Sequence, residues 1–473
     1  MLFRTPDGTL VPVDPGASGR PATLDLFIAK SRSGKSVLSN RLLLGLILSA
    51  ASSTGDGYRL PLIGKLDFGE TVAGLIDVVR EGLPAHQKHL AAYCRMELAP
   101  GYELNIFDVL PGCRKPTQGH RVFLENFLNL WCVDENGQSY ERMSMLINAV
   151  IDVVYDMVSD EGIGAYKKGY RRGVEREVDN ALDRYGIDVD RDTTWYEVTD
   201  LLCDREEWRI AGFASRQAVP TFGDLLQAAS DKRILDAFGE NDPRGTGESL
   251  PRVFASYIAF FRSRFPTLCT ATTLDLSDAR VIGVDVERIC PKGSGQAQRQ
   301  TEMMWLLGFY MVSRKHLTDP ADADAMPARV RDYHRRCFVE FNETYKRLEA
   351  DEYHLTKQSD FVGAMMEFIA RFSARYRLSL ALTSQEFGDF GQYLVDNATG
   401  IYILSGATED NISAMQSKFG LSGASVSVIR HGLNGPAPDG SGSPFIMKMR
   451  VHDKWYEHLL VNTMGPKIGR AHV

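Results

Sequence analysis

The segment from Thr23 to Ala51 constrains the fold of this chain most strongly. A short β-prone run, Thr23–Ile28, is followed by a loop rich in serine, Ala29–Gly34, and then by a stretch with helical spacing, Lys35–Ala51. The helical stretch is apolar almost all round, which predicts burial on several sides. Strand, loop and buried helix in this order is typical of the start of an α/β unit.

Further short strand-like runs follow, and helical stretches separate most of them. This alternation favours an α/β fold with a mostly parallel sheet that helices cover on both faces. Two runs near the end, Pro444–His452 and Trp455–Asn462, are typical of a hairpin. The other strand candidates are Leu60–Leu66, Glu103–Phe107, Ala279–Val286, Arg336–Phe341, Leu378–Thr383, Gly400–Leu404 and Ser425–Arg430.

The middle of the chain has a different pattern, with one helical stretch after another and no convincing strand. We interpret residues 119–266 as an all-α insertion between two halves of the α/β domain. The halves are predicted at residues 1–118 and 267–466. The last residues, 467–473, have no apolar period, and we interpret them as a non-native tail.

Composition narrows the classes of protein that fit. A chain of 473 residues is long enough for two structural units, or for one large unit with an insertion. The net charge of −7 argues against avid non-specific binding of DNA. Seven scattered cysteines without a C-x-x-C pair indicate neither a zinc ribbon nor a disulfide framework, and they favour a reducing cytoplasm. The longest apolar run, Leu42–Ala51, is too short for a membrane span.

The loop before the buried helix has the residue types of a phosphate-binding loop. Backbone N–H groups at the start of a helix cradle phosphate, Gly34 allows close approach, and the Lys35 ammonium would reach the β- and γ-phosphates of ATP. The Ser36 hydroxyl would hold Mg²⁺. Ala29 stands where the pattern G-x-x-x-x-G-K-[ST] has glycine, and alanine suits only a negative φ there. The predicted nucleotide-binding residues are Ala29, Lys30, Ser31, Arg32, Ser33, Gly34, Lys35, Ser36 and Val37. The alternative is a Ser/Gly turn without a ligand.

An enzyme with such a loop also needs a carboxylate at the end of a neighbouring strand. The best candidate is Glu340, because three apolar residues run into it in the predicted strand Arg336–Phe341. Val339 stands where an aspartate is expected. The alternative for Glu340 is a solvated acid at a strand end. The cluster Asp351-Glu-Tyr-His354 is interpreted as surface.

A polar amide at a strand end can sense the γ-phosphate. Gln385, which follows the apolar run Leu378–Thr383, is the candidate for this role, and a cap of the next helix is the alternative. Asp67, after the second strand, is a weaker candidate for contact with water or metal. The predicted catalytic residues are therefore Lys35, Glu340 and Gln385.

Short motifs along nearly the whole chain occur in a specific order. They are Arg4–Gly8, Pro15-Gly16, Ser33–Asn40, Asn105–Asp108, Gly112–Arg114, Leu274–Leu276, Pro291–Ser294, Arg299–Thr301, Glu340-Phe341, Ser384-Gln385, Asp389-Phe390 and Asn462–Pro466. In this ordered set the chain resembles the conserved ATPase of bacterial type IV secretion and conjugation systems, in particular its IcmB/DotO and TraU branch.

The resemblance implies a RecA-like P-loop core, ATP as ligand and a ring-like homo-oligomer. It further implies other secretion-channel components at the inner membrane as partners, secreted protein or DNA as cargo, and a cytoplasmic, peripheral location without a membrane span. Arg299 is a candidate for an arginine that acts in trans. Val339 motivates one alternative, a structural ring subunit that binds nucleotide without hydrolysing it. A second alternative is a DNA-translocating coupling protein, for which the basic run Tyr166–Arg172 would be suited.

Overall fold

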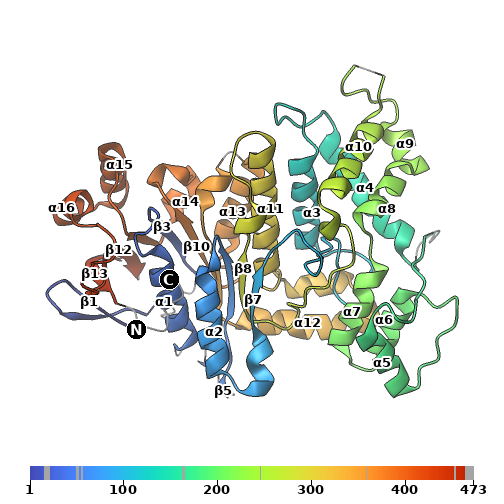
Figure 1. Cartoon of the computed structure of the whole chain (residues 1–473), viewed down its shortest axis with the longest axis horizontal. Coiled ribbons are helices and arrows are strands. Elements are labelled where there is room, and N and C mark those ends of the chain that lie inside the picture. Colours follow the sequence, from blue (N-terminus) through green and yellow to red (C-terminus); the bar gives the residue numbers. More distant parts are fainter. Residues whose placement is uncertain are drawn as a thin grey trace.

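The computed structural model describes residues 1–14, 22–49, 53–54, 57–161, 166–245, 247–357, 359–451 and 454–463. The proposed non-native tail at 467–473 lies outside the described residues. An 11-stranded sheet has the order β2-β1-β13-β12-β11-β3-β10-β9-β6-β8-β7. It occupies the left and central part of the molecule in Figure 1. A separate pair, β4 (Ser53–Thr54) and β5 (Gly57–Tyr58), forms a two-stranded sheet. No helix in the described part of the chain has the length and apolarity that crossing a bilayer requires.

The strands from β11 to β7 run parallel. In sheet order they are β11 (Gly400–Ile403), β3 (Leu24–Ile28), β10 (Leu378–Ser384), β9 (Lys346–Ala350), β6 (Leu62–Asp67), β8 (Val281–Asp285) and β7 (Ala91–Arg95). The sheet continues antiparallel on the other side of β11. These strands are β12 (Ser443–Val451), β13 (Lys454–Asn462), β1 (Leu2–Arg4) and β2 (Leu10–Pro12). The predicted hairpin near the end is therefore confirmed as β12–β13.

Helices cover both faces of the parallel strands. Leu26 of β3 and Leu66 of β6 face a core that includes Trp305 of α11 (Gln296–Ser313). Phe27 of β3 points the other way, toward α1 (Lys35–Ile47). Ile63 of β6 packs on that same face, with α1 and α2 (Ala73–Gly82). The strands thus alternate between two apolar layers, as a sheet buried on both faces requires.

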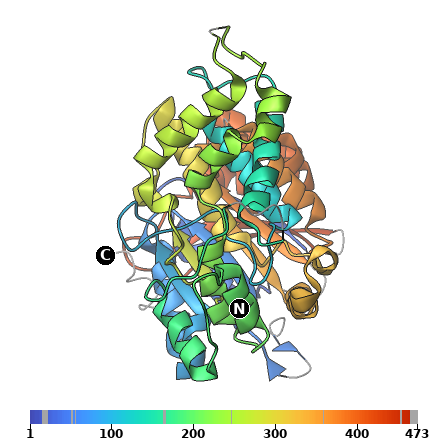
Figure 2. The same cartoon turned by 90° about the vertical axis from the view of Figure 1, so that its right-hand side faces the viewer.

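Helices α3 to α10 lie between β7 and β8 in the sequence, and the described residues from 118 to 264 contain no strand. They form a group beside the sheet, which Figure 2 shows in front. These helices are α3 (Gln118–Trp131), α4 (Met143–Val158), α5 (Arg176–Tyr185), α6 (Trp195–Cys203), α7 (Trp208–Ala218), α8 (Phe222–Ala229), α9 (Lys232–Phe238) and α10 (Leu250–Arg264). The predicted fold class, a mostly parallel sheet covered on both faces with a large helical insertion, is confirmed. The division of the chain into domains stays a prediction.

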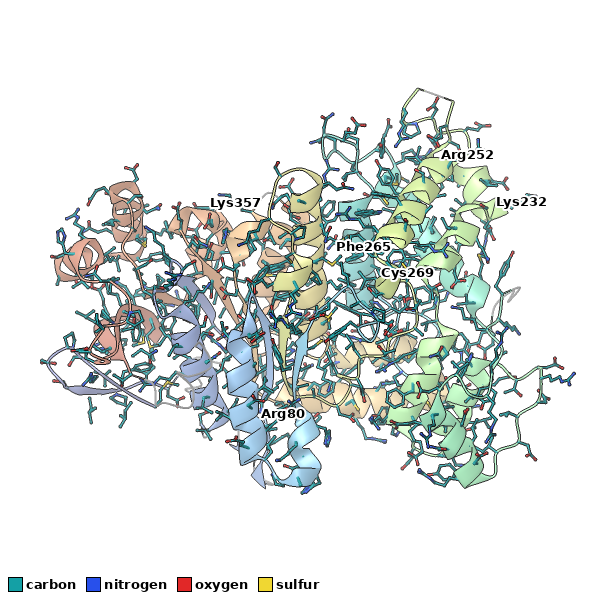
Figure 3. All side chains as sticks on the ribbon, viewed as in Figure 1. Arg80, Lys232, Arg252, Phe265, Cys269 and Lys357 are labelled. Atoms are coloured by element: carbon teal, nitrogen blue, oxygen red, sulfur yellow. The ribbon has the colours of Figure 1, made fainter. Side chains whose placement is uncertain are left out.

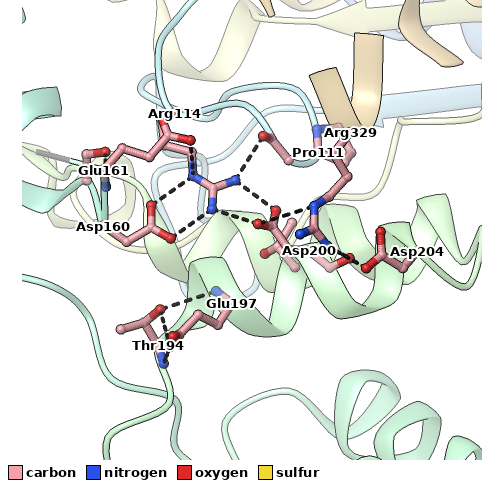
Figure 4. A network of polar contacts seen from close by, with 12 residues as sticks. Pro111, Arg114, Asp160, Glu161, Thr194, Glu197, Asp200, Asp204 and Arg329 are labelled. Carbon is pink, nitrogen blue, oxygen red and sulfur yellow. Dashed lines mark hydrogen bonds and ion pairs between the residues drawn. The ribbon is translucent and has the colours of Figure 1, made fainter. Parts of the chain in front are cut away.

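A buried arginine joins the insertion to the rest of the chain. The guanidinium of Arg114, just before α3, lies 2.8 Å from Asp160 and 2.8 Å from Asp200 of α6 (Figure 4). Arg329 of α12 (Ala328–Glu343) pairs with Asp204 at the end of α6. These pairs hold the insertion against a helix that precedes β9.

The remaining elements cover the sheet or connect its strands. The helices are α13 (Asp360–Phe372), α14 (Gln392–Asn397), α15 (Glu409–Phe419) and α16 (Gly423–His431). The 3₁₀ turns are η2 (Glu70–Val72), η3 (Ala85–Leu90), η4 (Pro266–Leu268), η5 (Glu287–Ile289), η6 (Pro320–Ala325), η7 (Tyr353–Thr356) and η8 (Phe387–Asp389).

Three strand predictions are wrong. Arg336–Phe341 belongs to α12, in which Val330, His334 and Phe338 are buried at a spacing of four, the period of a helix. Ser425–Arg430 belongs to α16, and Glu103–Phe107 forms no strand. Two strands that were not predicted, β7 and β9, take part in the parallel sheet.

Candidate active site

The loop Ala29–Ser36, called the phosphate loop from here on, connects β3 to α1 and is fixed at its start by backbone hydrogen bonds. The Ala29 N–H donates to the Ser384 carbonyl at 2.9 Å, and the Lys30 N–H donates to the Ser405 hydroxyl at 3.1 Å. Ser384 is the last residue of β10 and Ser405 follows β11, and these strands are the two neighbours of β3. The loop therefore starts from a defined position at the carboxyl edge of the parallel sheet.

Backbone conformation explains the residue types in this loop. Ala29 is fully buried and does not have the positive φ that would require glycine there. Gly34 has a φ of 88°, and a β-carbon at this position would lie 2.9 Å from the Ser443 hydroxyl oxygen. Glycine is therefore required at 34, whereas alanine is compatible with position 29.

The start of α1 is suited to an anion. Gly34 caps the helix without a side-chain hydrogen bond, and the first turn contains no acidic residue. The first N–H groups of a helix carry partial positive charge and have no acceptor within the helix. Together with the Lys35 ammonium, they form a place that fits the phosphates of a nucleotide.

An acid pair directly after β9 lies against the phosphate loop. The Lys35 ammonium is 2.8 Å from a carboxylate oxygen of Asp351 and 2.5 Å from one of Glu352. Burial lowers the pKa of Lys35, but the two carboxylates outweigh this effect and hold the pKa above its ordinary value. Both acids are largely buried, with 9% and 17% of their side chains exposed.

Gln385 reaches the same acid pair from β10. Its side-chain amide donates to the second carboxylate oxygen of Glu352 at 3.2 Å, and His354 Nδ1 lies 3.1 Å from that oxygen. Burial raises the pKa of Glu352, but Lys35 and Gln385 contribute to holding it below its ordinary value. Since β10 lies between β3 and β9, three adjacent parallel strands bring Lys35, Gln385 and Glu352 together at their carboxyl ends.

The structure contradicts the placement of Glu340 at this site. Glu340 lies in α12, where its carboxylate is 2.9 Å from the guanidinium of Arg280 and 3.3 Å from that of Arg59. Arg280 directly precedes β8, so Glu340 lies at the amino edge of the parallel sheet, opposite the phosphate loop. Val339 is a half-exposed helical residue, so it does not replace an aspartate of the site.

The acid pair had been interpreted as surface, and this interpretation is wrong. The residues of β9, Lys346–Ala350, are all buried although three of them are charged, which is why the run has no apolar pattern. The sequence does contain a weak sign of this strand end. Leu348 and Ala350 alternate with charged residues, and two consecutive acids follow them. Asp351 and Glu352 occupy the place, next to Lys35, that was predicted for Glu340.

Asp67 lies beside this site, at the end of the strand next to β9. Its carboxylate is fully buried and accepts hydrogen bonds from the Thr71 hydroxyl and, at 2.7 Å, from the Val72 N–H. Burial raises its pKa to about 6, with the negative charge of Asp351 adding to this effect and Lys65 opposing it. Its second oxygen has no hydrogen-bond partner among the described residues.

The residues present fit Mg²⁺ and ATP. Mg²⁺ prefers oxygen ligands and binds through one or two protein oxygens together with the phosphates of the nucleotide. The Ser36 hydroxyl, in the first turn of α1, and the Asp351 carboxylate, directly after β9, are the oxygens that would hold the ion. The roles of Ser36 as a metal ligand and of Gln385 as a sensor thus stay predictions.

Comparisons with known proteins bear on the fold. The chain is similar to VirB4 of Thermoanaerobacter pseudethanolicus, with a TM-score of 0.58 and 15% identity over 98% of this chain and 96% of that chain. The genome packaging NTPase B204 from Sulfolobus turreted icosahedral virus 2, solved with AMPPCP, matches with a TM-score of 0.23 and 11% identity over 41% of this chain and 78% of that chain. No family model and no curated protein matches the sequence. The chain has the fold of VirB4 over nearly its whole length, and the predicted RecA-like α/β class is confirmed.

Proposed function

We propose that this chain binds ATP with Mg²⁺ at the phosphate loop and hydrolyses it. The observation that carries the proposal is the contact of Lys35 with both Asp351 and Glu352, which places a phosphate-binding cation and two acids at one point. Phosphoryl transfer depends mainly on such positioning and on electrostatic stabilisation.

Each residue of the site has a distinct role in this proposal. Lys35 and the first N–H groups of α1 hold the β- and γ-phosphates, and Ser36 and Asp351 hold Mg²⁺. Glu352 orients and polarises the attacking water by accepting a hydrogen bond from it. Gln385 contacts Glu352 directly, so it would register the loss of the γ-phosphate and transmit it to β10.

We further propose that the ATPase is a motor subunit of a bacterial type IV secretion or conjugation system. The ordered motifs that resemble such ATPases support this assignment, in particular to the IcmB/DotO and TraU branch, and so does the shared fold with VirB4. The subunit would act as a ring-like homo-oligomer, in the cytoplasm and peripheral at the inner membrane. Its partners would be other secretion-channel components, with protein or DNA as cargo.

The two alternatives have little support in the described residues. The first alternative, a subunit that binds nucleotide without hydrolysing it, rests on Val339 in the place of an aspartate. Val339 lies on α12 instead, and an aspartate and a glutamate follow β9. For a DNA-translocating protein, the basic run at 166–172 would have to face solvent unpaired. Two of its four basic residues are paired instead, since Lys168 lies 3.0 Å from Asp224 and Arg172 pairs with Asp183.

Mg²⁺-dependent ATP hydrolysis by the purified full chain tests the proposal, with Lys35→Ala measured alongside at several protein concentrations. We expect the turnover per subunit of the wild type to rise with protein concentration, and we expect Lys35→Ala to have no turnover. Equal turnover in both proteins would refute the assignment of the site. Turnover per subunit that does not change with protein concentration would refute the ring-like oligomer.

A further inference from the structure

Four charged side chains lie buried between α1 and the sheet, beneath the phosphate loop. They are Asp25 of β3, Arg347 and Glu349 of β9, and Lys65 of β6, and none of these side chains is more than 6% exposed. Two are acidic and two are basic, so the group is neutral as a whole. We call these four residues the buried charge cluster.

The cluster connects the strands that lead to the site. The Arg347 guanidinium lies 2.8 Å from Asp25 and 2.8 Å from Glu349, so it joins β3 to β9 across β10. Lys65 is the register partner of Glu349 on β6, with their charged atoms 4.0 Å apart. The cluster thus runs across the same adjacent strands whose carboxyl ends form the site.

Helix α1 is attached to the cluster by two consecutive side chains. The Ser39 hydroxyl donates to Glu349 and accepts from the Lys65 ammonium at 2.7 Å. The Asn40 amide oxygen accepts from Lys65 at 2.8 Å, and its N–H₂ group donates to the Thr71 carbonyl at 2.7 Å. Ser39 lies about one turn after Ser36, so these bonds fix the end of the helix that carries the phosphate loop.

Stability alone does not account for such a cluster. Burying charges costs desolvation free energy, and apolar residues of similar volume are often as stable or more stable in their place. What hydrogen-bonded buried charges provide in addition is a defined geometry between the elements that carry them. Here those elements are α1, which carries Lys35, and β9, which ends one residue after Glu349 and is followed directly by the acid pair.

We propose that Lys65, Arg347 and Glu349 are positioning residues that hold α1 in register with β9, so that the phosphate loop keeps its geometry relative to Asp351 and Glu352. This inference rests on the proposed ATPase function. Hydrolysis needs both groups at once, whereas the loop alone supplies most contacts to the phosphates. Loss of the cluster therefore lowers kcat and leaves KM for ATP nearly unchanged.

The test uses a double variant that keeps the cluster neutral, Lys65→Met with Glu349→Gln, and leaves the Arg347–Asp25 pair in place. We expect a melting temperature close to that of the wild type, a kcat at least about tenfold lower, and a KM within about twofold, because small misplacements of reacting groups cost large factors in rate. Wild-type kcat in a stably folded double variant would overturn the proposal, as would an equal loss in kcat and in ATP affinity.

A second measurement does not depend on hydrolysis. Amide hydrogen exchange should show lower protection in α1 of the double variant than in the wild type, with protection in α2 as the internal control. Unchanged protection in α1 would overturn the positioning role whether or not the wild type hydrolyses ATP. Lowered protection in α1 of the double variant, together with no ATPase activity in the wild type, would mean that the proposed function alone fails. If the double variant does not fold, Ser39→Ala replaces it in both assays, with a smaller fall in kcat expected and an unchanged kcat contradicting the proposal.

Discussion

The two edges of the parallel sheet carry similar groups and differ in what those groups can do. At the carboxyl edge, Lys35 contacts Asp351 and Glu352, next to the free N–H groups of α1. At the amino edge, Glu340 contacts Arg280 and Arg59. Two labelled residues help to find these edges in Figure 3. Lys357 follows the acid pair and is near the carboxyl edge, and Arg80 donates to the Ala91 carbonyl at the start of β7, on the amino edge.

Topology explains the difference between the two edges. Loops that follow adjacent parallel strands converge at the carboxyl edge, and there the start of a helix meets side chains from neighbouring strand ends. At the amino edge Arg280 and Arg59 neutralise Glu340 in ion pairs, on the side of the sheet opposite the phosphate loop. A carboxylate near a cation is therefore insufficient to identify a catalytic acid, and its edge of the sheet is the stronger criterion.

The largest effect is expected from Asp351→Asn. This change removes a metal-binding charge at the carboxyl edge, and electrostatic stabilisation of phosphoryl transfer is worth factors of about 1000 in kcat. We expect turnover to fall by about that factor, and the Mg²⁺ concentration needed for half-maximal turnover to rise. Near wild-type turnover across a Mg²⁺ titration would contradict the assignment of the metal site to the carboxyl edge.

Asp67→Asn tests burial at the carboxyl edge through pH. Because the folded pKa of about 6 exceeds the ordinary value, the wild type loses stability as the pH rises through about 4 to 6. The asparagine variant lacks this loss. Urea unfolding should therefore show the free energy of unfolding of the variant rising relative to the wild type over this window, by up to about 3 kcal/mol. A pH-independent difference would contradict the raised pKa.

Gly34→Ala tests the geometry of the phosphate loop. The positive φ and the close approach of Ser443 predict destabilisation by about 1–2 kcal/mol and weaker binding of a fluorescent ATP analogue, by about tenfold. The matched control is Ala29→Gly, for which we expect wild-type affinity. Placing Gly34→Ala in a Ser443→Gly background should restore part of the stability, and no recovery would show that contact with Ser443 is unimportant.

The smallest effect is expected from Glu340→Gln at the amino edge. Its partly exposed ion pairs with Arg280 and Arg59 are worth about 1 kcal/mol or less. Thermal unfolding should show a slight decrease in stability that high salt reduces. A loss of ATP affinity in this variant would mean that the amino edge takes part in the site.

Sequence patterns predicted the order of strand, loop and helix around the phosphate loop because all these signals are local, whereas phosphate binding by the loop stays a prediction. Strand, loop and helix follow one another as β3 (Leu24–Ile28), the phosphate loop and α1 (Lys35–Ile47). The same reasoning predicted Gln385, since β10 is a continuous apolar run before a polar residue. Gln385 contacts Glu352, which in turn contacts Lys35, and its role as a sensor stays a prediction.

The acid pair was missed for reasons that are not local. In β9, Arg347 and Glu349 are charged and buried because they pair with Asp25 and Lys65, which are hundreds of residues away in the sequence. When the ion-pair partners of such a strand are unknown, its charged residues suggest a solvent-exposed segment. The run before Glu340 was instead apolar over three residues, and only the longer spacing of Val330, His334 and Phe338 shows its helical period.

The most direct test of the account is ATP turnover of a matched pair, Glu352→Gln and Glu340→Gln, measured with the wild type under identical Mg²⁺ and protein concentrations. Each variant removes one negative charge from one edge of the sheet without changing its shape. The account predicts that Glu352→Gln binds ATP but loses turnover, by about 100-fold or more, whereas Glu340→Gln stays within about twofold of the wild type. Loss of turnover in Glu340→Gln with normal turnover in Glu352→Gln would contradict it.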